Sequence, residues 1–213
     1  PEGDYAPALG TYPYWDAVTA RYGSDAAWAT ATLARLRDLH VNTLGAWSDS
    51  PFYDDAPYAL LLGLTGQNFG TGEMQDLFDP GWEAGVRSQA AAAAAVHGDN
   101  PLLLGYWSDN ELHFGPDWRE LHLFDSYLSR PLAAPGKQQL LAFLHDRYPT
   151  FDALRPDFPT TPTTWAHLDA PATATAWTAA GGRGPPTAWV GLVAERYFSV
   201  TADAIRDADP NHL

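Results

Sequence analysis

The run Trp107-Ser108-Asp109-Asn110-Glu111 carries a carboxylic acid and an amide of the kinds that take part in cleavage of a glycosidic bond. That reaction uses one carboxyl group to protonate the departing oxygen and a second to attack or stabilise the anomeric carbon. Glu111 can supply the first carboxyl group, and Asn110 beside it can hydrogen-bond a sugar hydroxyl. Because Trp107 and Leu112 flank Glu111, we expect it to be partly desolvated, which favours the protonated form of an acid.

Similar side chains follow two earlier apolar runs. Residues 41–47 lead into Ser48 and Asp49, and residues 58–65 lead into Gly66-Gln67-Asn68-Phe69. Flat aromatic rings beside amides and carboxylates suit sugars, whose rings offer an apolar C–H face and a rim of hydroxyls. The candidate substrate-binding residues are therefore Asn110, Trp47, Asp49, Asn68, Trp107 and Asp109.

Three apolar runs must position these side chains. Residues 41–47, 58–65 and 102–107 are predicted to be buried strands, since each run is continuously apolar, as in a parallel sheet covered on both faces. In a parallel barrel the carboxyl ends of the strands meet at one mouth, where barrel enzymes keep their catalytic groups. We therefore expect the three sets of side chains to share one pocket.

Helical patterns separate and follow the predicted strands. Ser24 is the expected N-cap of one helix, and Asp79-Pro80 is expected to open another that ends near Gly98. Further helices are predicted over residues 137–148 and 187–207. This order favours parallel α/β units. The last helix places four apolar residues on one face, namely Val193, Tyr197, Val200 and Ala204.

Length and composition limit the classes of protein. The 213 residues suit a single domain, residues 1–213, in which residues 114–186 are read as a helical and loop insertion over the barrel mouth. Acidic residues outnumber basic ones 26 to 12, so the net charge of -14 argues against nucleic acid and anionic membranes as partners. Without Cys, disulfides and thiol chemistry are excluded. No apolar run is long enough for a membrane span.

The strand end at residues 105–111 resembles the Asn-Glu signature that closes the fourth strand in the A clan of glycoside hydrolases. In that clan the Glu is the acid/base, a role that the resemblance assigns to Glu111. A helical insertion of family 50 β-agarases and of family 42 β-galactosidases is similar to residues 137–148, 151–154 and 164–168. The resemblance covers nearly the whole chain. Further blocks similar to the family 50 β-agarases and their relatives are residues 41–49, 76–80 and 207–213.

This resemblance implies an α/β fold, a partial (β/α)8 barrel covering about strands two to four. It implies retaining, β-agarase-like hydrolysis of a galactose-containing oligo- or polysaccharide, with no cofactor and no metal. The clan's nucleophile is a second Glu at the end of the seventh strand, and Glu195 in a helical run is a poor substitute for it. We therefore expect the chain to be a fragment, inactive by itself, of a secreted or periplasmic protein. The sequence does not indicate an oligomeric state.

Two other classes of function fit the same residues. A non-catalytic glycan-binding protein would use the aromatic barrel mouth without a second carboxylate. A metal-dependent hydrolase would use Asp109, Glu111 and His113, which share one face if the backbone there is extended. Trp47 and Trp107 are either sugar platforms or packing residues.

Overall fold

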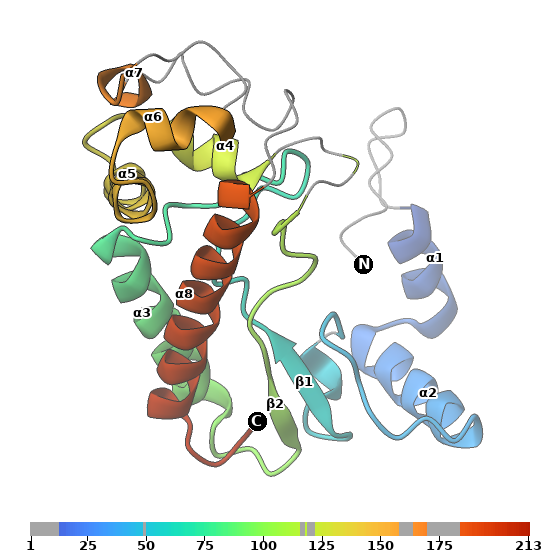
Figure 1. Ribbon diagram of the computed structural model, residues 1–213. Helices are drawn as coiled ribbons and strands as arrows, with labels where there is room; N and C mark the ends of the chain where they lie inside the picture. The colour runs from blue at the N-terminus through green and yellow to red at the C-terminus, as the bar shows by residue number, and fades with distance from the viewer. Residues whose placement is uncertain (1–12, 49, 116–117, 119–121, 158–163, 170–183) are drawn as a thin grey trace. The chain divides into compact units, whose positions relative to one another are not determined.

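The computed structural model describes residues 13–48, 50–115, 118, 122–157, 164–169 and 184–213, and the chain forms two compact units. Unit 1 comprises Pro1–Leu60, Asp99–Tyr106 and His212–Leu213, and unit 2 comprises Leu61–Gly98 and Trp107–Asn211. Within the described ranges, none of the helices combines the length and the apolar character needed to cross a bilayer. The helices and strands (Figure 1) are α1 Pro13–Tyr22, α2 Asp25–Asp38, η2 Ser50–Phe52, β1 Tyr58–Leu61, α3 Pro80–His97, β2 Leu103–Trp107, α4 Leu123–Leu128, α5 Pro135–Arg147, α6 Phe151–Leu154, η3 Arg155–Asp157, α7 Ala166–Asp169 and α8 Gly184–Ala208.

Unit 1 packs α2 against the first residues of the strands. Ser24 caps α2 as predicted, because its side chain accepts a hydrogen bond from the backbone N–H of Ala27 at 3.2 Å. The helix therefore begins at Asp25, and one of the N–H groups of its first turn has a hydrogen-bond acceptor outside the helix. The buried apolar residues of this unit are Ala29, Leu33, Leu44, Phe52, Tyr58 and Leu103.

Two of the three predicted strands are present and are neighbours in one sheet. The N–H of Tyr58 donates to the carbonyl of Leu102 at 2.9 Å, and the N–H of Leu62 donates to the carbonyl of Trp107 at 2.9 Å. Because the later residue of one strand bonds to the later residue of the other, the two strands are parallel. β1 ends four residues before the predicted Thr65. Gly63 explains this early end, since its φ of +71° leaves the extended region.

The prediction of a strand over residues 41–47 was wrong. This segment forms one isolated parallel bridge, between Leu44 and Tyr58. Val41 is 43% exposed and Trp47 is 70% exposed, whereas Leu44 in the middle of the segment is buried. A strand needs successive ladder hydrogen bonds, and the apolar character of these residues does not supply them.

β2 is flanked on both edges in unit 1. The N–H of Leu213 donates to Leu104 at 3.3 Å and the N–H of Tyr106 donates to Leu213 at 2.8 Å, which is the bonding pattern of a parallel pair. Leu44, β1, β2 and Leu213 thus lie side by side in chain order. β2 is not continuously buried as expected, because Leu104 between two buried residues is 45% exposed.

In unit 2, α3 and α8 lie side by side (Figure 1). Asp79 caps α3 by accepting from the N–H of Gly81 at 2.7 Å, and Gly98 is the C-cap, so both predicted ends of this helix are confirmed. The guanidinium of Arg196 on α8 contacts the carboxylate of Glu83 on α3 at 2.7 Å. The predicted apolar face of α8 is buried, with Val193, Tyr197, Val200 and Ala204 at 0%, 0%, 4% and 2% exposure.

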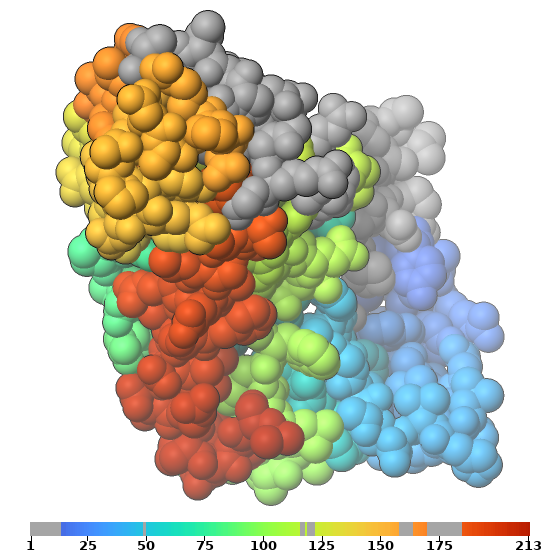
Figure 2. Space-filling view, viewed as in Figure 1, coloured from blue at the N-terminus to red at the C-terminus, as the bar shows by residue number. Residues whose placement is uncertain are grey.

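The helices between β2 and α8 share the core of α3 and α8. Phe124 and Tyr127 of α4, and Leu140 and Leu144 of α5, are buried in one cluster with Trp189 of α8. In Figure 2 the yellow and orange atoms of this segment lie directly against the red atoms of α8. The predicted helix at residues 137–148 is confirmed as α5. Placement of residues 114–186 over a barrel mouth stays a prediction.

Gly136 sits where α5 meets α4 and the turn before α3. Its N–H donates to Asp76 Oδ2 at 2.8 Å, and a Cβ atom at this position would run into the Asp76 carboxylate and the Tyr127 ring. We expect Gly136→Ala to lower the free energy of unfolding by about 1–3 kcal/mol, as overpacking does in cores. Urea unfolding measures this change.

Gly85→Ala on α3 is the control, since a Cβ atom there meets nothing within 4 Å, and this substitution should instead stabilise the protein by up to about 1 kcal/mol. Equal effects of the two substitutions would contradict this account.

Lys137 is a fully buried cation whose Nζ donates to the carbonyl of Leu128 at the end of α4. Burial lowers the pKa of Lys137 from its ordinary 10.5 to about 8, against the opposing effect of Asp169. Between these two pH values the unfolded state binds more protons, so the free energy of unfolding should rise with pH relative to that of Lys137→Met. Urea unfolding of both proteins from pH 7 to 10.5 measures the difference. A constant difference across this range would show that Lys137 titrates normally.

Candidate functional site

Hydrogen bonds join the segments that follow the two strands. We call residues 62–69 the first exit loop and residues 108–115 the second exit loop. The Asp109 carboxylate accepts from the N–H of Thr65 at 2.9 Å and from its hydroxyl at 2.9 Å. It also accepts from the hydroxyl of Tyr197 on α8 at 2.8 Å. Asp109 therefore holds both exit loops and α8 in one arrangement.

The electrostatics of this cluster keep Tyr197 a donor. Burial, together with the neighbouring Asp109 carboxylate, raises the pKa of Tyr197 above its usual range. Burial also raises the pKa of Asp109, while the hydrogen bonds from Tyr197 and Thr65 act in the opposite direction. Since both oxygens of Asp109 are engaged within the protein, its role in the structure is to fix the loops, and contact with a sugar stays a prediction.

Gln67 connects the first exit loop to the residues around Glu111. Its Nε2 donates to the carbonyl of Glu111 at 3.0 Å, and its Oε1 accepts from the N–H of His113 at 2.8 Å. Glu111 has a φ of +47°, the left-handed region that non-glycine residues avoid at a cost on the order of 1–3 kcal/mol. Gln67 was not among the residues predicted from the sequence, and its place in the run Gly66-Gln67-Asn68 was the available signal.

The candidate acid Glu111 is exposed, as is Asn110 before it. The partial desolvation expected from Trp107 and Leu112 is therefore absent from the described part of the chain. The reason is that the Trp107 ring is itself 59% exposed and Leu112 faces the core of unit 2. Both Asn110 and Glu111 are open to a ligand from solvent.

Three other predicted binding residues lie in different surroundings. Asn68 is exposed, and its Oδ1 accepts from the N–H of Thr71 at 3.1 Å, which closes a turn at the end of the first exit loop. Trp47 belongs to unit 1, where its ring is 70% exposed, so neither Trp47 nor Trp107 is a core residue here. Asp49 lies outside the described residues.

A pair of aromatic rings adds to the first exit loop. Phe69 and Trp118 lie with ring centroids 6.1 Å apart and are 59% and 67% exposed. Phe69 directly follows Asn68, so this apolar surface adjoins a predicted binding residue. No pattern of residue spacing pairs Phe69 with a residue so far along the chain.

The second exit loop does not have the extended backbone that the metal hypothesis requires. β2 ends at Trp107, and the positive φ of Glu111 breaks the alternation of Asp109, Glu111 and His113. Among the residues that the structure describes, no group of three His, Cys, Asp or Glu side chains could hold a metal ion.

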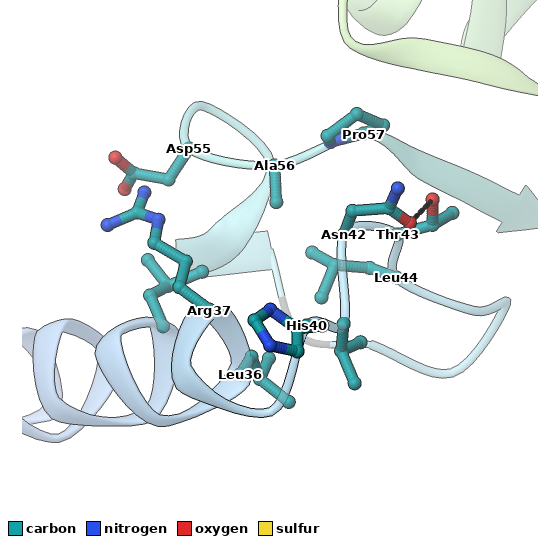
Figure 3. A pocket seen from close by; sticks show the side chains of 11 residues that line it. Leu36, Arg37, His40, Asn42, Thr43, Leu44, Asp55, Ala56 and Pro57 are labelled. Carbon is teal, nitrogen blue, oxygen red and sulfur yellow. Dashed lines mark hydrogen bonds between the residues drawn. The ribbon is translucent and has the colours of Figure 1, made fainter.

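Unit 1 contains a separate pocket of about 450 Å³ (Figure 3). Leu33 and Leu36 of α2 line it together with Arg37, His40 and Asp55. It also includes the residues that precede Leu44 and Tyr58, and thus lies at the amino ends of the strand positions. Ligands of parallel α/β sheets bind outside the carboxyl ends of the strands, so this pocket is not the candidate site.

Parallel neighbouring strands, helices between them and polar loops at their carboxyl ends define an α/β protein with a candidate sugar site. No family model matches the chain. Solved structures share its fold: an exo-β-agarase and the agarase AgWH50C each give a TM-score of 0.73 at 22% identity over 92% of the chain. A third, PfGH50B, gives 0.74 at 23% identity over the same share.

Two curated relatives carry the name β-agarase, both from Vibrio sp. (strain JT0107). β-Agarase B is 22% identical over 205 residues, 89% of the chain, and β-agarase A is 32% identical over 116 residues, 48% of the chain. The chain spans 21% and 12% of these relatives. It spans 29%, 30% and 31% of the three solved structures.

Replacing Asp109 tests its role as the joint between the loops and α8. In Asp109→Asn one oxygen becomes an amide nitrogen that cannot accept from Tyr197 or Thr65, so a buried donor loses its partner. We expect the free energy of unfolding to fall by about 1–3 kcal/mol. Chemical denaturation measures it, with Asp146→Asn on the exposed side of α5 as the control, expected to change stability by less than about 0.5 kcal/mol. Equal stability of the two variants would remove Asp109 from this role.

Proposed function

We propose that the protein containing this chain is a retaining glycoside hydrolase that acts on an agar-like, galactose-containing polysaccharide. The observation that carries the proposal is the position of Glu111, a carboxylic acid after a parallel strand in a chain whose fold and relatives are those of β-agarases. Asn110 beside it offers an amide to a sugar hydroxyl, and the same unit exposes the aromatic residues Trp107, Phe69 and Trp118.

The proposed fold of the whole domain is a (β/α)8 barrel. Leu44, β1, β2 and Leu213 lie side by side in chain order and in parallel, which is how consecutive strands follow one another around such a barrel. The chain contributes about three or four of these positions. Residues 114–186 are proposed to form the insertion over the mouth of the barrel.

In the proposed reaction Glu111 protonates the departing glycosidic oxygen while a second carboxylate attacks the anomeric carbon. Glu111 then takes a proton from water, which hydrolyses the glycosyl-enzyme intermediate and releases the sugar with retained configuration. Asn110 is placed to bind a hydroxyl of the reacting sugar. Glu195 is exposed on α8, so we propose that the second carboxylate belongs to the larger part of the protein that relatives have beyond this chain.

A polymer of this kind does not enter cells, so we propose that the protein works in the periplasm or outside the cell. The full barrel would also shield Glu111 from water, since the chain corresponds to 29% of a solved agarase. That shielding would favour the protonated carboxylic acid.

Replacing Glu111 in the full-length protein tests the proposal. Glu111→Gln keeps the shape of the side chain and removes its proton transfer, so kcat on agarose oligosaccharides should fall by about 10²–10⁴-fold. Glu195→Gln on the exposed side of α8 is the control and should leave kcat unchanged. Proton NMR of the first product should show retained anomeric configuration. Unchanged turnover by Glu111→Gln would refute the assignment.

The wild-type protein separates this proposal from a non-catalytic role. Exposed rings beside an amide would also suit a glycan-binding protein that lacks a second carboxylate. Binding of agarose oligosaccharides in calorimetry without any hydrolysis by the full-length protein would favour that alternative.

A further inference from the structure

The side-chain amide of Gln67 bonds to the backbone around the candidate acid. A primary amide is a donor and an acceptor at once, so this one group binds the carbonyl of Glu111 at 3.0 Å and the N–H of His113 at 2.8 Å. We propose that Gln67 is a positioning residue, which holds Glu111 in the left-handed conformation that directs its carboxyl group at the glycosidic oxygen. This inference rests on the proposed function of Glu111.

Gln67 is itself anchored, so it can serve as a fixed point. Its own N–H donates to the Thr65 hydroxyl at 3.1 Å, and that hydroxyl donates to Asp109 Oδ1 at 2.9 Å. Asp109 in turn accepts a hydrogen bond from the hydroxyl of Tyr197, and Tyr197 is fully buried. The second exit loop is therefore held on both sides of Glu111, by Thr65 before it and by Gln67 after it.

The backbone of Glu111 needs such support because its conformation is unfavourable. Glu111 combines a φ of +47° with a side chain exposed to solvent, so burial does not fix it in the left-handed region. Without the amide of Gln67, rotation to a negative φ would carry the carboxyl group away from its position. Catalysis is sensitive to such shifts, since a misplacement of about 1 Å can cost about 10²-fold in rate.

Two substitutions remove different parts of the interaction. Gln67→Met keeps the length and unbranched shape of the side chain and removes both hydrogen bonds. Gln67→Glu keeps an acceptor for the N–H of His113 and loses the donor to the carbonyl of Glu111. Gln89→Met, on the exposed side of α3, is the matched control for the first substitution.

The experiment compares two substrates with the full-length protein. An agarose oligosaccharide has a leaving oxygen that needs a proton, whereas the 2,4-dinitrophenyl β-glycoside of an agarose disaccharide releases a phenolate that does not. The ratio kcat/KM reports the steps up to glycosyl transfer for both. For Gln67→Met and Gln67→Glu we expect kcat/KM on the oligosaccharide to fall by about 10–100-fold, with the loss in kcat. On the dinitrophenyl glycoside, kcat/KM of both Gln67 variants should stay within about threefold of the wild-type value. The control Gln89→Met should stay within the same range on both substrates.

Each outcome decides the inference. The inference would be overturned by an equal fall in kcat/KM on both substrates or by loss of cooperative unfolding in both Gln67 variants, because Gln67 would then support the fold as a whole. It would also be overturned by no fall in kcat/KM on either substrate, because Gln67 would then have no role in catalysis. Activity of Glu111→Gln equal to wild type on the oligosaccharide would overturn the proposed function itself. An inactive Glu111→Gln beside fully active Gln67 variants would overturn the positioning role alone.

Discussion

The Asp109 carboxylate is the contact on which the arrangement of the candidate site depends. It receives two hydrogen bonds from Thr65 and one from Tyr197, so a single half-buried acceptor joins the first exit loop, the second exit loop and α8. A carboxylate removed from water is stable only when such donors replace the solvent. The demand for satisfied hydrogen bonds thus fixes loops that have little regular structure of their own.

The core of unit 2 supplies the rigid support for that contact. Tyr197 can reach Asp109 because α8 buries one apolar face against α3 and the helices between β2 and α8. The ion pair between Arg196 and Glu83 adds a polar contact between α8 and α3. Packing therefore determines where the hydroxyl of Tyr197 lies, and the hydroxyl determines where the second exit loop runs.

Local signals in the sequence correctly indicated several elements. Ser24 and Asp79 are side chains that satisfy helix N-terminal N–H groups within three residues, so their effect is readable from neighbours in the chain. The spacing of Val193, Tyr197 and Val200 identified the buried face of α8 for the same reason. By contrast, residues 41–47 are as apolar as a strand, yet they make one bridge, because strand pairing depends on a partner elsewhere in the chain.

The sequence by itself determined which side chains are present after each strand and that Glu111 and Asn110 stand together after β2. The tertiary structure decided how they are held: that Asp109 supports the loops, that Gln67 binds the carbonyl of Glu111 and the N–H of His113, and that Glu111 is exposed in a left-handed conformation. These contacts join residues 44 to 88 positions apart. Hydrogen bonds over such separations form only after the helices and strands have packed, and no local pattern of residue types specifies them in advance.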